Sequence, residues 1–306
     1  MHATSTSAAG AFMRVGVVWP VFASEPTVSV GPGGEAVMWW SMSPPGTEPP
    51  GGQECSVGCT DGQTVPSCNS NYTRGQTFTT YVSWTTDEAW TVWSTPLVIQ
   101  QGTVTSQDTN MASVVLQNGS VVGLWRSKQY GGVHRVTAAH YTDPASYDWH
   151  ISEPPLFPEA AHPLAPEDPF VWTTWSVSTN KTRYHALFHH RSCSAPWVNR
   201  SLGYAAVDCG GLAYSEDGVQ WHYGDVAGTA YQPVVEWQQA ETRDIRNSGF
   251  EAAYYRFVRR ERPHLAFDAR GEMVALSNGV VYGWPGQRRD GMHDASYSLV
   301  QPIRSR

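Results

Sequence analysis

The sequence predicts an all-β fold. Its 306 residues include 28 glycines and 21 prolines, which mark many turns, while only 15% of the residues are charged. This composition favours short strands joined by loops over long helices. A pair of hairpins also recurs along the chain, and such a repeat is typical of an array of similar sheets.

The first recurring hairpin has a polar or proline-containing strand start, an apolar strand, a turn and a second apolar strand. Asn-Gly and Gly-Gly turns between apolar runs are strong hairpin signals. The four copies of this hairpin run over residues 25–40, 110–126, 167–190 and 261–276.

The fourth copy opens on a cluster of charge. Arg259, Arg260 and Arg262 surround Glu261 directly before Pro263. Because proline lacks an N–H and fixes φ, we expect it at the start of a strand. Such a cluster marks either a functional site or a solvated group of ion pairs at a strand end, and both interpretations stay open.

The second recurring hairpin joins a small-residue strand to an aromatic strand through a polar turn. Two hairpins of these kinds make one blade of a β-propeller, which has four antiparallel strands with the first lining the central channel. The copies are 81–85 with 89–93, 136–140 with 147–149, and 212–221, and 296–300 is the remnant of one more.

We therefore predict a five-bladed β-propeller whose first blade is incomplete. The chain, 1–306, forms a single domain in this interpretation. Residues 2–5 and 12–15 pair as an outer hairpin, which implies that the inner hairpin of the first blade is missing; a tail, or a strand closing the ring, is the alternative. The expected segments are the remnant 1–24 and the blades 25–98, 110–157, 166–227 and 261–303.

Charge and hydropathy limit the classes of partner. The net charge of −7 provides no basic stripe for a nucleic acid or an anionic membrane. No run of about 20 apolar residues is present, so we expect no membrane span. Fourteen tryptophans and fourteen tyrosines suit a sugar-binding surface, although aromatic residues also serve as ordinary core residues.

Cysteines and glycosylation triplets are typical of a secreted protein, so we expect the secretory pathway although no signal peptide is visible. One disulfide between Cys193 and Cys209 would close a short segment. Zinc is the alternative for the remaining cysteines, but no fourth ligand stands at the right spacing, and we expect neither a metal nor another cofactor. The residues concerned are Cys55, Cys59 and Cys68, and the sequons begin at Asn71, Asn118, Asn180 and Asn199.

Several motifs in this order and spacing resemble five-bladed-propeller glycoside hydrolases of the arabinanase and β-xylosidase type, the family-43 clan, and their eukaryotic relatives. The resemblance covers most of the chain. The most specific pieces are residues 167–172 with 184–189, and 260–265; the others are Glu25-Pro26, Asn110 and the turn from Ser215 to Trp221.

The resemblance implies a carbohydrate substrate and three carboxylates at the mouth of the channel. Glycoside hydrolysis needs a protonated carboxyl at the leaving oxygen and an ionised one behind the anomeric carbon. By this resemblance Asp168 is the orienting and tuning aspartate, and Glu261 is the acid, although flanking arginines lower a carboxyl pKa. The first-blade base would lie before Met1, and Glu25 is the carboxylate that heads the next inner strand.

Other residues at these strand ends are candidates for substrate binding: Trp40, Asn110, Arg126, Glu167, His185, Arg262 and His264. A structural role is the alternative for both histidines and for Trp40, Trp125 and Trp172. Three functions remain from the sequence alone. They are a glycoside hydrolase acting on a plant- or algal-type glycan, a non-catalytic carbohydrate-binding propeller, and a protein-interaction propeller, for which no repeat signature is visible.

Overall fold

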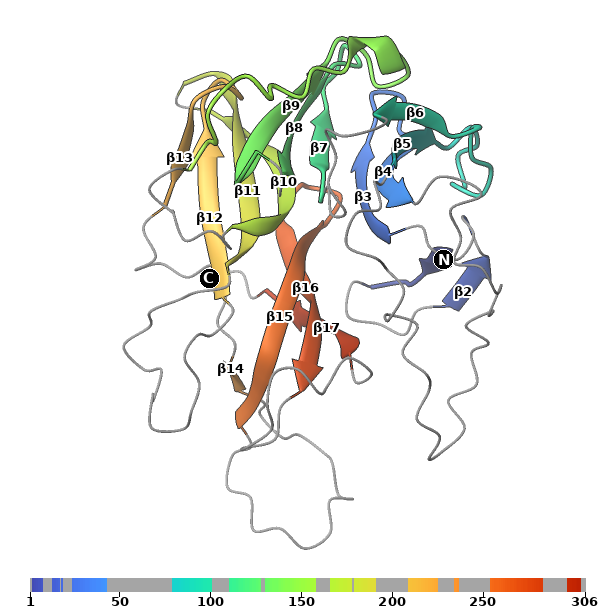
Figure 1. Cartoon of the computed structure of the whole chain (residues 1–306). Coiled ribbons are helices and arrows are strands. Elements are labelled where there is room, and N and C mark those ends of the chain that lie inside the picture. The colour runs from blue at the N-terminus through green and yellow to red at the C-terminus, as the bar shows by residue number, and fades with distance from the viewer. Residues whose placement is uncertain are drawn as a thin grey trace, which may run out of the picture. The chain divides into compact units, whose positions relative to one another are not determined.

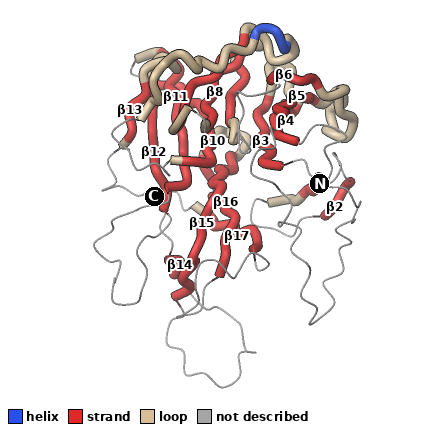
Figure 2. The backbone as a smooth tube through the Cα atoms, in the orientation of Figure 1, coloured by secondary structure: helices blue, strands red, loops and turns tan. Residues whose placement is uncertain are grey.

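The computed structural model is built from β-strands (Figures 1 and 2). Within the described residues the only helical turn is a 3-10 turn at Pro144–Ser146, so the prediction of an all-β fold is confirmed. No helix in this part of the chain is long and apolar enough to cross a membrane. The structure describes residues 2–7, 13–16, 18, 24–42, 79–100, 110–127, 130–157, 166–177, 179–190, 209–224, 234–236, 254–282 and 296–303.

Two compact units make up the chain. The central unit is Val17–Glu153, and the flanking unit combines Met1–Gly16 with Pro154–Arg306.

Among its described residues, the central unit contains two antiparallel sheets whose strands follow the order of the chain. The side-chain oxygen Oγ1 of Thr27 donates a hydrogen bond to the carbonyl of Met111 at 2.7 Å and thereby ties the first sheet to the start of the second. One sheet is β3 (Ser24–Val30), β4 (Ala36–Met42), β5 (Thr79–Trp84) and β6 (Leu97–Gln100); the other is β7 (Ala112–Val115), β8 (Val121–Arg126) and β9 (Val133–Ala138).

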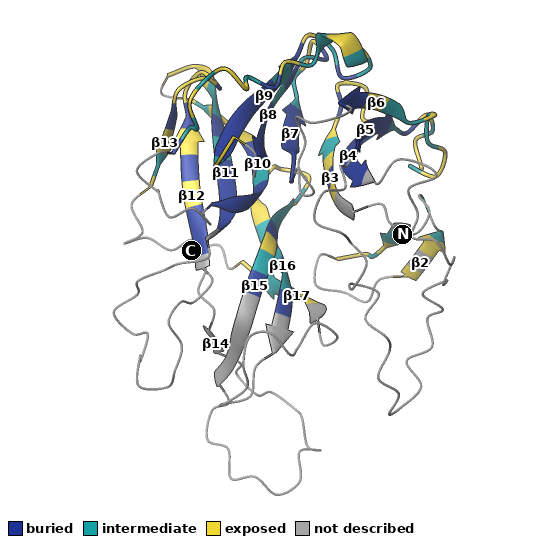
Figure 3. Cartoon of the chain, in the orientation of Figure 1, coloured by how far each residue is buried: buried dark blue, intermediate teal, exposed yellow. Residues whose placement is uncertain are grey.

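Strands β8 and β9 of the central unit are largely buried (Figure 3). Two tryptophans without exposed surface, Trp39 and Trp125, anchor the core of this unit. A buried indole needs a partner for its N–H. Trp39 donates to the hydroxyl of Tyr147 at 3.2 Å, and Trp125 donates to the carbonyls of Arg135 and Trp149 at 3.0 Å. In these two residues, therefore, apolar burial is combined with a satisfied indole N–H.

The part of the flanking unit that the structure describes contains one two-stranded and two four-stranded antiparallel sheets, again in chain order. Four antiparallel strands in chain order are the topology of a propeller blade, so the predicted blade pattern is confirmed at the level of the sheets; the number of blades stays a prediction. The sheets are β1 (His2–Thr4) and β2 (Met13–Gly16); β10 (Glu167–Ser176), β11 (Lys181–His190), β12 (Cys209–Ser215) and β13 (Trp221–Tyr223); and β14 (Val234–Glu236), β15 (Tyr254–Phe267), β16 (Met273–Tyr282) and β17 (Ser296–Pro302).

Residues 2–5 and 12–15 were expected to pair, and β1 and β2 do form an antiparallel hairpin. A missing inner hairpin stays a prediction. Cys55, Cys59, Cys68 and Cys193 lie outside the described residues, as do Asn71 and Asn199, and the side chain of Cys209 is also outside them, so the expected disulfide and the zinc alternative stay untested.

The prediction of two outer strands is wrong, because residues 89–93 and 147–149 do not form strands. The fourth strand of the first sheet is β6, whereas residues 89–93 contribute only an isolated bridge between Thr85 and Trp93. Asp87 explains this difference, because its carboxylate accepts the backbone N–H groups of Thr91 and Val92 at 2.8 and 2.7 Å and folds the segment into a turn. Residues 147–149 likewise contribute only a bridge, between Thr137 and Asp148.

The expected start of the charged strand is also wrong. β15 begins at Tyr254, seven residues before Glu261, so the charges and Pro263 lie inside the strand. The pairing of β15 with β16 shifts register between Glu261 and His264. A proline within a sheet is tolerated at such a bulge, because the ladder hydrogen bond that it cannot donate is already interrupted there.

Candidate functional site

The same local irregularity occurs in three strands that open the recurring hairpins. Register shifts fall between Ser24 and Thr27 in β3, between Glu167 and Phe170 in β10, and between Glu261 and His264 in β15. Each of these short segments contains a glutamate and a proline: Glu25 and Pro26, Glu167 and Pro169, Glu261 and Pro263. A bulge redirects side chains and is common beside active sites.

Two residues at these bulges have left-handed backbone. Asp168 and Arg262 each have φ of 52°, and each directly precedes a proline. A non-glycine residue in this region costs about 1–2 kcal/mol, and a residue before proline normally prefers an extended conformation. Strained backbone of this kind clusters at functional sites, so both positions are candidates on conformational grounds.

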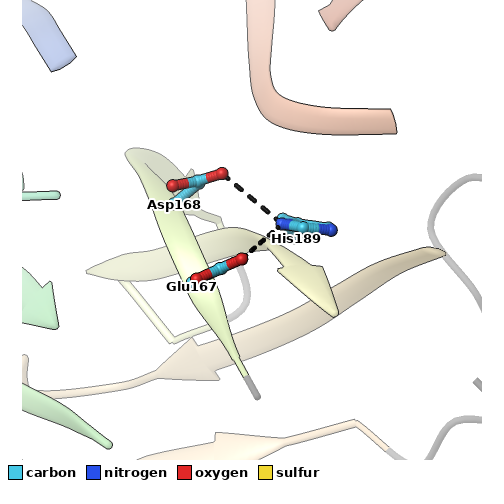
Figure 4. A group of neighbouring side chains, drawn as sticks. All are labelled: Glu167, Asp168 and His189. Carbon is cyan, nitrogen blue, oxygen red and sulfur yellow. Dashed lines mark ion pairs between the residues drawn. The ribbon is translucent and has the colours of Figure 1, made fainter. Parts of the chain in front are cut away.

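The bulge of β10 brings two carboxylates to one imidazole ring (Figure 4). Nδ1 of His189 on β11 lies 3.1 Å from Oε1 of Glu167 and 3.5 Å from Oδ2 of Asp168. Across the hairpin His189 is paired in register with Glu167. The three side chains are between 0% and 9% exposed, so their charges interact in surroundings from which water is largely excluded.

A second sheet of the flanking unit reaches the same carboxylate. The backbone N–H of Arg262 on β15 donates to Oδ2 of Asp168 at 3.3 Å. His264, two residues further along β15, places its Nδ1 at 3.1 Å from the Arg262 carbonyl and its ring 5.3 Å from that of Phe170. Burial lowers the pKa of His264, while the Arg262 carbonyl and the charge of Asp168 oppose that shift.

Buried polar side chains brace the bulge of β15 from the neighbouring strand. Asn278 on β16 accepts a hydrogen bond from Nε of Arg260 at 2.9 Å and donates one to the Glu261 carbonyl at 3.3 Å. The guanidinium of Arg260 also binds the side-chain oxygen of Gln301. Arg260 is thereby held within its own sheet, and the backbone of Glu261 is fixed beside the residue that contacts Asp168.

The predicted catalytic residues are placed as follows. Asp168 lies in the cluster with Glu167 and His189, and Glu261 is paired with Gly279, adjacent to Arg262. Glu25 lies in β3 of the central unit, at that strand's register shift, and its side chain is outside the described residues. The catalytic roles assigned from the sequence stay predictions.

Two predicted binding residues lie at one end of a hairpin in the central unit. The pairing of Ala112 with Leu124 sets the register that brings Asn110 and Arg126 to the same end of β7 and β8. Asn110 has φ of 32°, and the two residues are 5% and 6% exposed. The central unit therefore also has buried polar side chains, an arginine and an asparagine, at the end of a hairpin, as the flanking unit has at the β10 bulge.

The remaining predicted binding residues take packing positions. Trp40 is 3% exposed and stacks on Tyr81 with ring centroids 5.7 Å apart. His185 stacks on Trp172 at 5.1 Å, and its Nε2 lies 2.8 Å from Oγ1 of Thr174. His185 stands four residues before His189 on β11, which is about 13 Å along an extended strand, so it does not join the cluster at the bulge.

Sequence reasoning missed His189, which lies near the end of the predicted hairpin 167–190. The available signal was the hairpin itself, because residues paired across two strands share one face. A glutamate at the start of β10 and a histidine near the end of β11 were therefore candidates for a pair. The bulge at Asp168, which adds a second carboxylate to that pair, carries no sequence signal beyond the following Pro169.

This arrangement suits proton transfer and charge stabilisation. Two carboxylates beside an imidazole can hold or release a proton, and a backbone N–H aimed at Asp168 favours its ionised form. The ligand atoms of Glu167, Asp168 and His189 lie within 4.8 Å of one another, so the group also has the composition and spacing to hold a metal ion.

Comparison with known proteins adds only distant similarity. No family model and no curated protein matches the sequence. Among solved structures, the chain is similar to an α-L-arabinofuranosidase from Lactobacillus brevis, with 11% identity, TM-score 0.44, and coverage of 90% of this chain and 71% of that one. For a thermostable family-43 glycoside hydrolase the identity is 12% and the TM-score 0.43, with 72% of this chain and 64% of that one covered. For a β-fructofuranosidase from Bombyx mori the identity is 13% and the TM-score 0.42, with 92% of this chain and 46% of that one covered.

The chain thus spans less than two thirds of the last two structures. Glycoside hydrolases are among the proteins that it resembles, as the motifs predicted.

Proposed function

We propose that this chain is a glycoside hydrolase-like protein that acts on a plant- or algal-type glycan by carboxylate acid–base catalysis. The observation that supports the proposal is the convergence of two strained bulges, because the carboxylate of Asp168 on β10 accepts a hydrogen bond from Arg262, the residue after Glu261 on β15. Acidic side chains at two strand bulges in one unit provide the paired carboxyl groups that glycoside hydrolysis requires.

The proposed roles follow from the surroundings of each group. Asp168, which accepts the Arg262 N–H and lies beside His189, is suited to stay ionised and to orient the reacting groups. Glu261 is the proposed acid, which protonates the leaving oxygen. Glu25 is the candidate base, on the evidence of its place at the equivalent bulge of β3. His264, with its lowered pKa, would be neutral near pH 7 and able to bind sugar hydroxyl groups.

A non-catalytic carbohydrate-binding protein is the second candidate. The observation in its favour is burial, because none of the side chains of Glu167, Asp168 and His189 is more than 9% exposed. A reacting sugar must reach the carboxyl groups directly, so the burial of these carboxylates favours a supporting role beside a sugar-binding surface over direct proton transfer.

One experiment tests the proposed function and separates these candidates. The full chain is screened for reducing-sugar release from plant and algal polysaccharides and from aryl arabinofuranosides, xylosides and fructofuranosides, and in parallel for binding on a glycan array. We expect the parent protein to hydrolyse at least one of these substrates. Asp168→Asn and Glu261→Gln should each reduce the rate of hydrolysis at least 100-fold, because general acid–base catalysis contributes about 10²–10⁴-fold.

The matched control is Glu272→Gln, which removes an exposed carboxylate at the turn before β16. It should leave activity unchanged. Glycan binding without hydrolysis would favour the second candidate, and equal activity of Asp168→Asn, Glu261→Gln and the parent would refute the site.

We also propose that the protein passes through the secretory pathway. Asn118 and Asn180, which begin two of the sequons, are exposed in turns and would be accessible to glycosylation. After expression in a eukaryotic secretory host, the mass of the protein should fall on treatment with an endoglycosidase. The fall in mass should be smaller for the double variant Asn118→Gln, Asn180→Gln. An unmodified parent would contradict the accessibility of these sites.

A further inference from the structure

The end of the β10–β11 hairpin away from the Glu167 bulge exposes apolar side chains that the proposed reaction does not use. Trp175, near the end of β10, is 60% exposed, and Val177, two residues further on, is 86% exposed. Single apolar side chains at a surface are ordinary, but tryptophan is highly buried in most proteins. A ligand that carries C–H groups would remove this indole from water.

A glycosylation sequon lies at the same end of the hairpin. Asn180 is exposed in the turn before β11, and the sequon ends at Thr182, the second residue of that strand. Thr182 is the direct cross-strand partner of Trp175. Because residues paired across an antiparallel ladder share one face, the indole and the hydroxyl residue of the sequon lie on the same face of the sheet.

This pairing brings the acceptor amide of the sequon close to the indole. Paired Cα atoms lie about 5 Å apart, and two residues span at most about 7 Å of chain, so the Cα atoms of Asn180 and Trp175 are within about 12 Å. Asn180 has φ of 52°, a left-handed conformation that asparagine adopts more readily than most residues. An indole and an asparagine-linked sugar both extend well beyond their Cα atoms, so the two groups can meet.

The first sugar of an N-linked glycan suits an indole surface. N-acetylglucosamine presents ring C–H groups on one face and an acetyl methyl, while its hydroxyl groups stay in water. The face of an aromatic ring carries partial negative charge, which attracts C–H hydrogens. Stacking of the sugar on the indole therefore combines this attraction with the burial of apolar surface.

We propose that Asn180 carries an N-linked glycan whose first N-acetylglucosamine stacks on the indole of Trp175. In the covalent step, Nδ2 of Asn180 loses a proton and bonds to the anomeric carbon of a lipid-linked oligosaccharide, and the bond from that carbon to the lipid diphosphate breaks. The inference rests on the proposed passage through the secretory pathway and does not depend on glycoside hydrolysis. Trp175 is in this way a platform for the protein's own glycan.

The test uses the full chain secreted from a eukaryotic host and trimmed by an endoglycosidase that leaves one N-acetylglucosamine on each modified asparagine. Glycopeptide mass spectrometry should find Asn180 modified. With ¹³C-labelled N-acetylglucosamine, the NMR signals of this sugar should be shifted upfield, because protons over the face of an aromatic ring are shielded. Their assignment comes from their loss in Asn180→Gly, and the upfield shift should disappear in Trp175→Ala.

Hydrogen exchange at the amides of the β10–β11 hairpin measures the effect of the contact on local stability. The glycan should slow exchange, and this effect should be about 3- to 10-fold larger with Trp175 than with Trp175→Ala, as expected for an aromatic contact. Asn180→Gly supplies the form without glycan in both backgrounds. Glycine adopts the left-handed φ freely, and its backbone effect cancels in this double-mutant cycle.

Tyr214→Ala is the matched control, since Tyr214 is a 40% exposed aromatic residue on β12 of the same sheet. Its row of paired residues reaches β10 at Trp172, three residues before Trp175, so the two rings lie on opposite faces. The control should leave the sugar signals and the exchange rates unchanged.

Two results would overturn the inference alone. One is a modified Asn180 whose sugar signals are the same with Trp175 and with Trp175→Ala, and the other is an unmodified Asn180 in a protein whose Asn118 is glycosylated. If neither asparagine is modified, the proposed secretory passage fails together with the inference. A chain that shows the upfield shift but releases no reducing sugar refutes the proposed hydrolysis and supports the inference.

Discussion

Arg260 is a charged side chain that is only 2% exposed, and amide oxygens of Asn278 and Gln301 bind it. Asn278→Ala would remove one of these acceptors and the donor to the Glu261 carbonyl. Because hydrogen bonds to buried charged groups contribute about 1.5–3 kcal/mol, we expect the free energy of unfolding to fall by a similar amount. Urea denaturation measures this change, with the exposed-residue variant Gln220→Ala as the control. An Asn278→Ala protein as stable as the parent would show that the brace is unimportant.

Asp217 is the residue on which the turn between β12 and β13 depends. Its Oδ1 accepts hydrogen bonds from the backbone N–H groups of Val219 and Gln220, each at 2.8 Å. These hydrogen bonds lower the pKa of the carboxyl, and the bond from Gln220 has the largest effect. A carboxyl whose pKa is lowered by folding stabilises the protein above its unfolded pKa of about 3.9, and this stabilisation is lost as the pH falls.

Asp217→Asn should therefore lower the free energy of unfolding at pH 7, by less than about 1 kcal/mol because the turn is exposed to solvent. The difference from the parent should shrink as the pH falls below about 4. Denaturation curves at a series of pH values measure it. A difference that stays constant with pH would mean that the charge of Asp217 is not the cause.

At the scale of elements, the bulges decide where the functional side chains lie. Arg262 has φ of 52°, a conformation that glycine adopts freely and that costs residues with a Cβ about 1 kcal/mol. We expect Arg262→Gly to be more stable than Arg262→Ala by about that amount, because the side chain is lost in both and only the Cβ differs. Thermal denaturation of the two variants measures the difference. Equal stabilities, or a more stable alanine variant, would contradict the strain.

The elements were predictable where turn chemistry is local. The Asn118-Gly119 turn correctly placed β7 and β8, and Gly119 has φ of 83° as such a turn requires. The β6 strand was missed because the Asp87 carboxylate takes up N–H groups that the aromatic pattern assigned to a sheet. The start of β15 was placed too late because Pro263 suggested a strand start, whereas it occupies a bulge.

Within the central unit, polar bonds join residues more than a hundred positions apart. Trp39 donates to the Tyr147 hydroxyl, which donates to the Tyr141 carbonyl, and the Tyr141 hydroxyl donates to Glu35 at 2.7 Å. Burial raises the pKa of Tyr141 to about 12, so the hydroxyl remains a donor across the ordinary pH range.

Tyr147→Phe should lower the free energy of unfolding by about 1–3 kcal/mol, because it leaves the buried Trp39 N–H without its acceptor. The control is Tyr130→Phe, whose parent residue is 38% exposed. Chemical denaturation followed by tryptophan fluorescence measures both. A Tyr147→Phe protein as stable as Tyr130→Phe would indicate that this polar chain does not stabilise the unit.

For the molecule as a whole, the sequence predicted the class of fold and singled out the glutamates and prolines of β3, β10 and β15, because repeats and prolines are visible in the chain itself. It expected these residues at strand starts, whereas the structure has them at bulges. It did not predict the union of Glu167, Asp168 and His189, because the two-against-one pairing at a bulge decides which side chains face each other. Nor did it predict that Arg262 contributes its backbone N–H, since every residue except proline carries that group.

A crystal structure of the full chain with the oligosaccharide that binds best in the glycan panel would test most directly whether the two bulges form the site. We expect a sugar hydroxyl or ring oxygen within about 3 Å of a side chain at the β10 or β15 bulge, Asp168, Glu261 or His264. Sugar bound only elsewhere, with both bulges free of ligand, would contradict it.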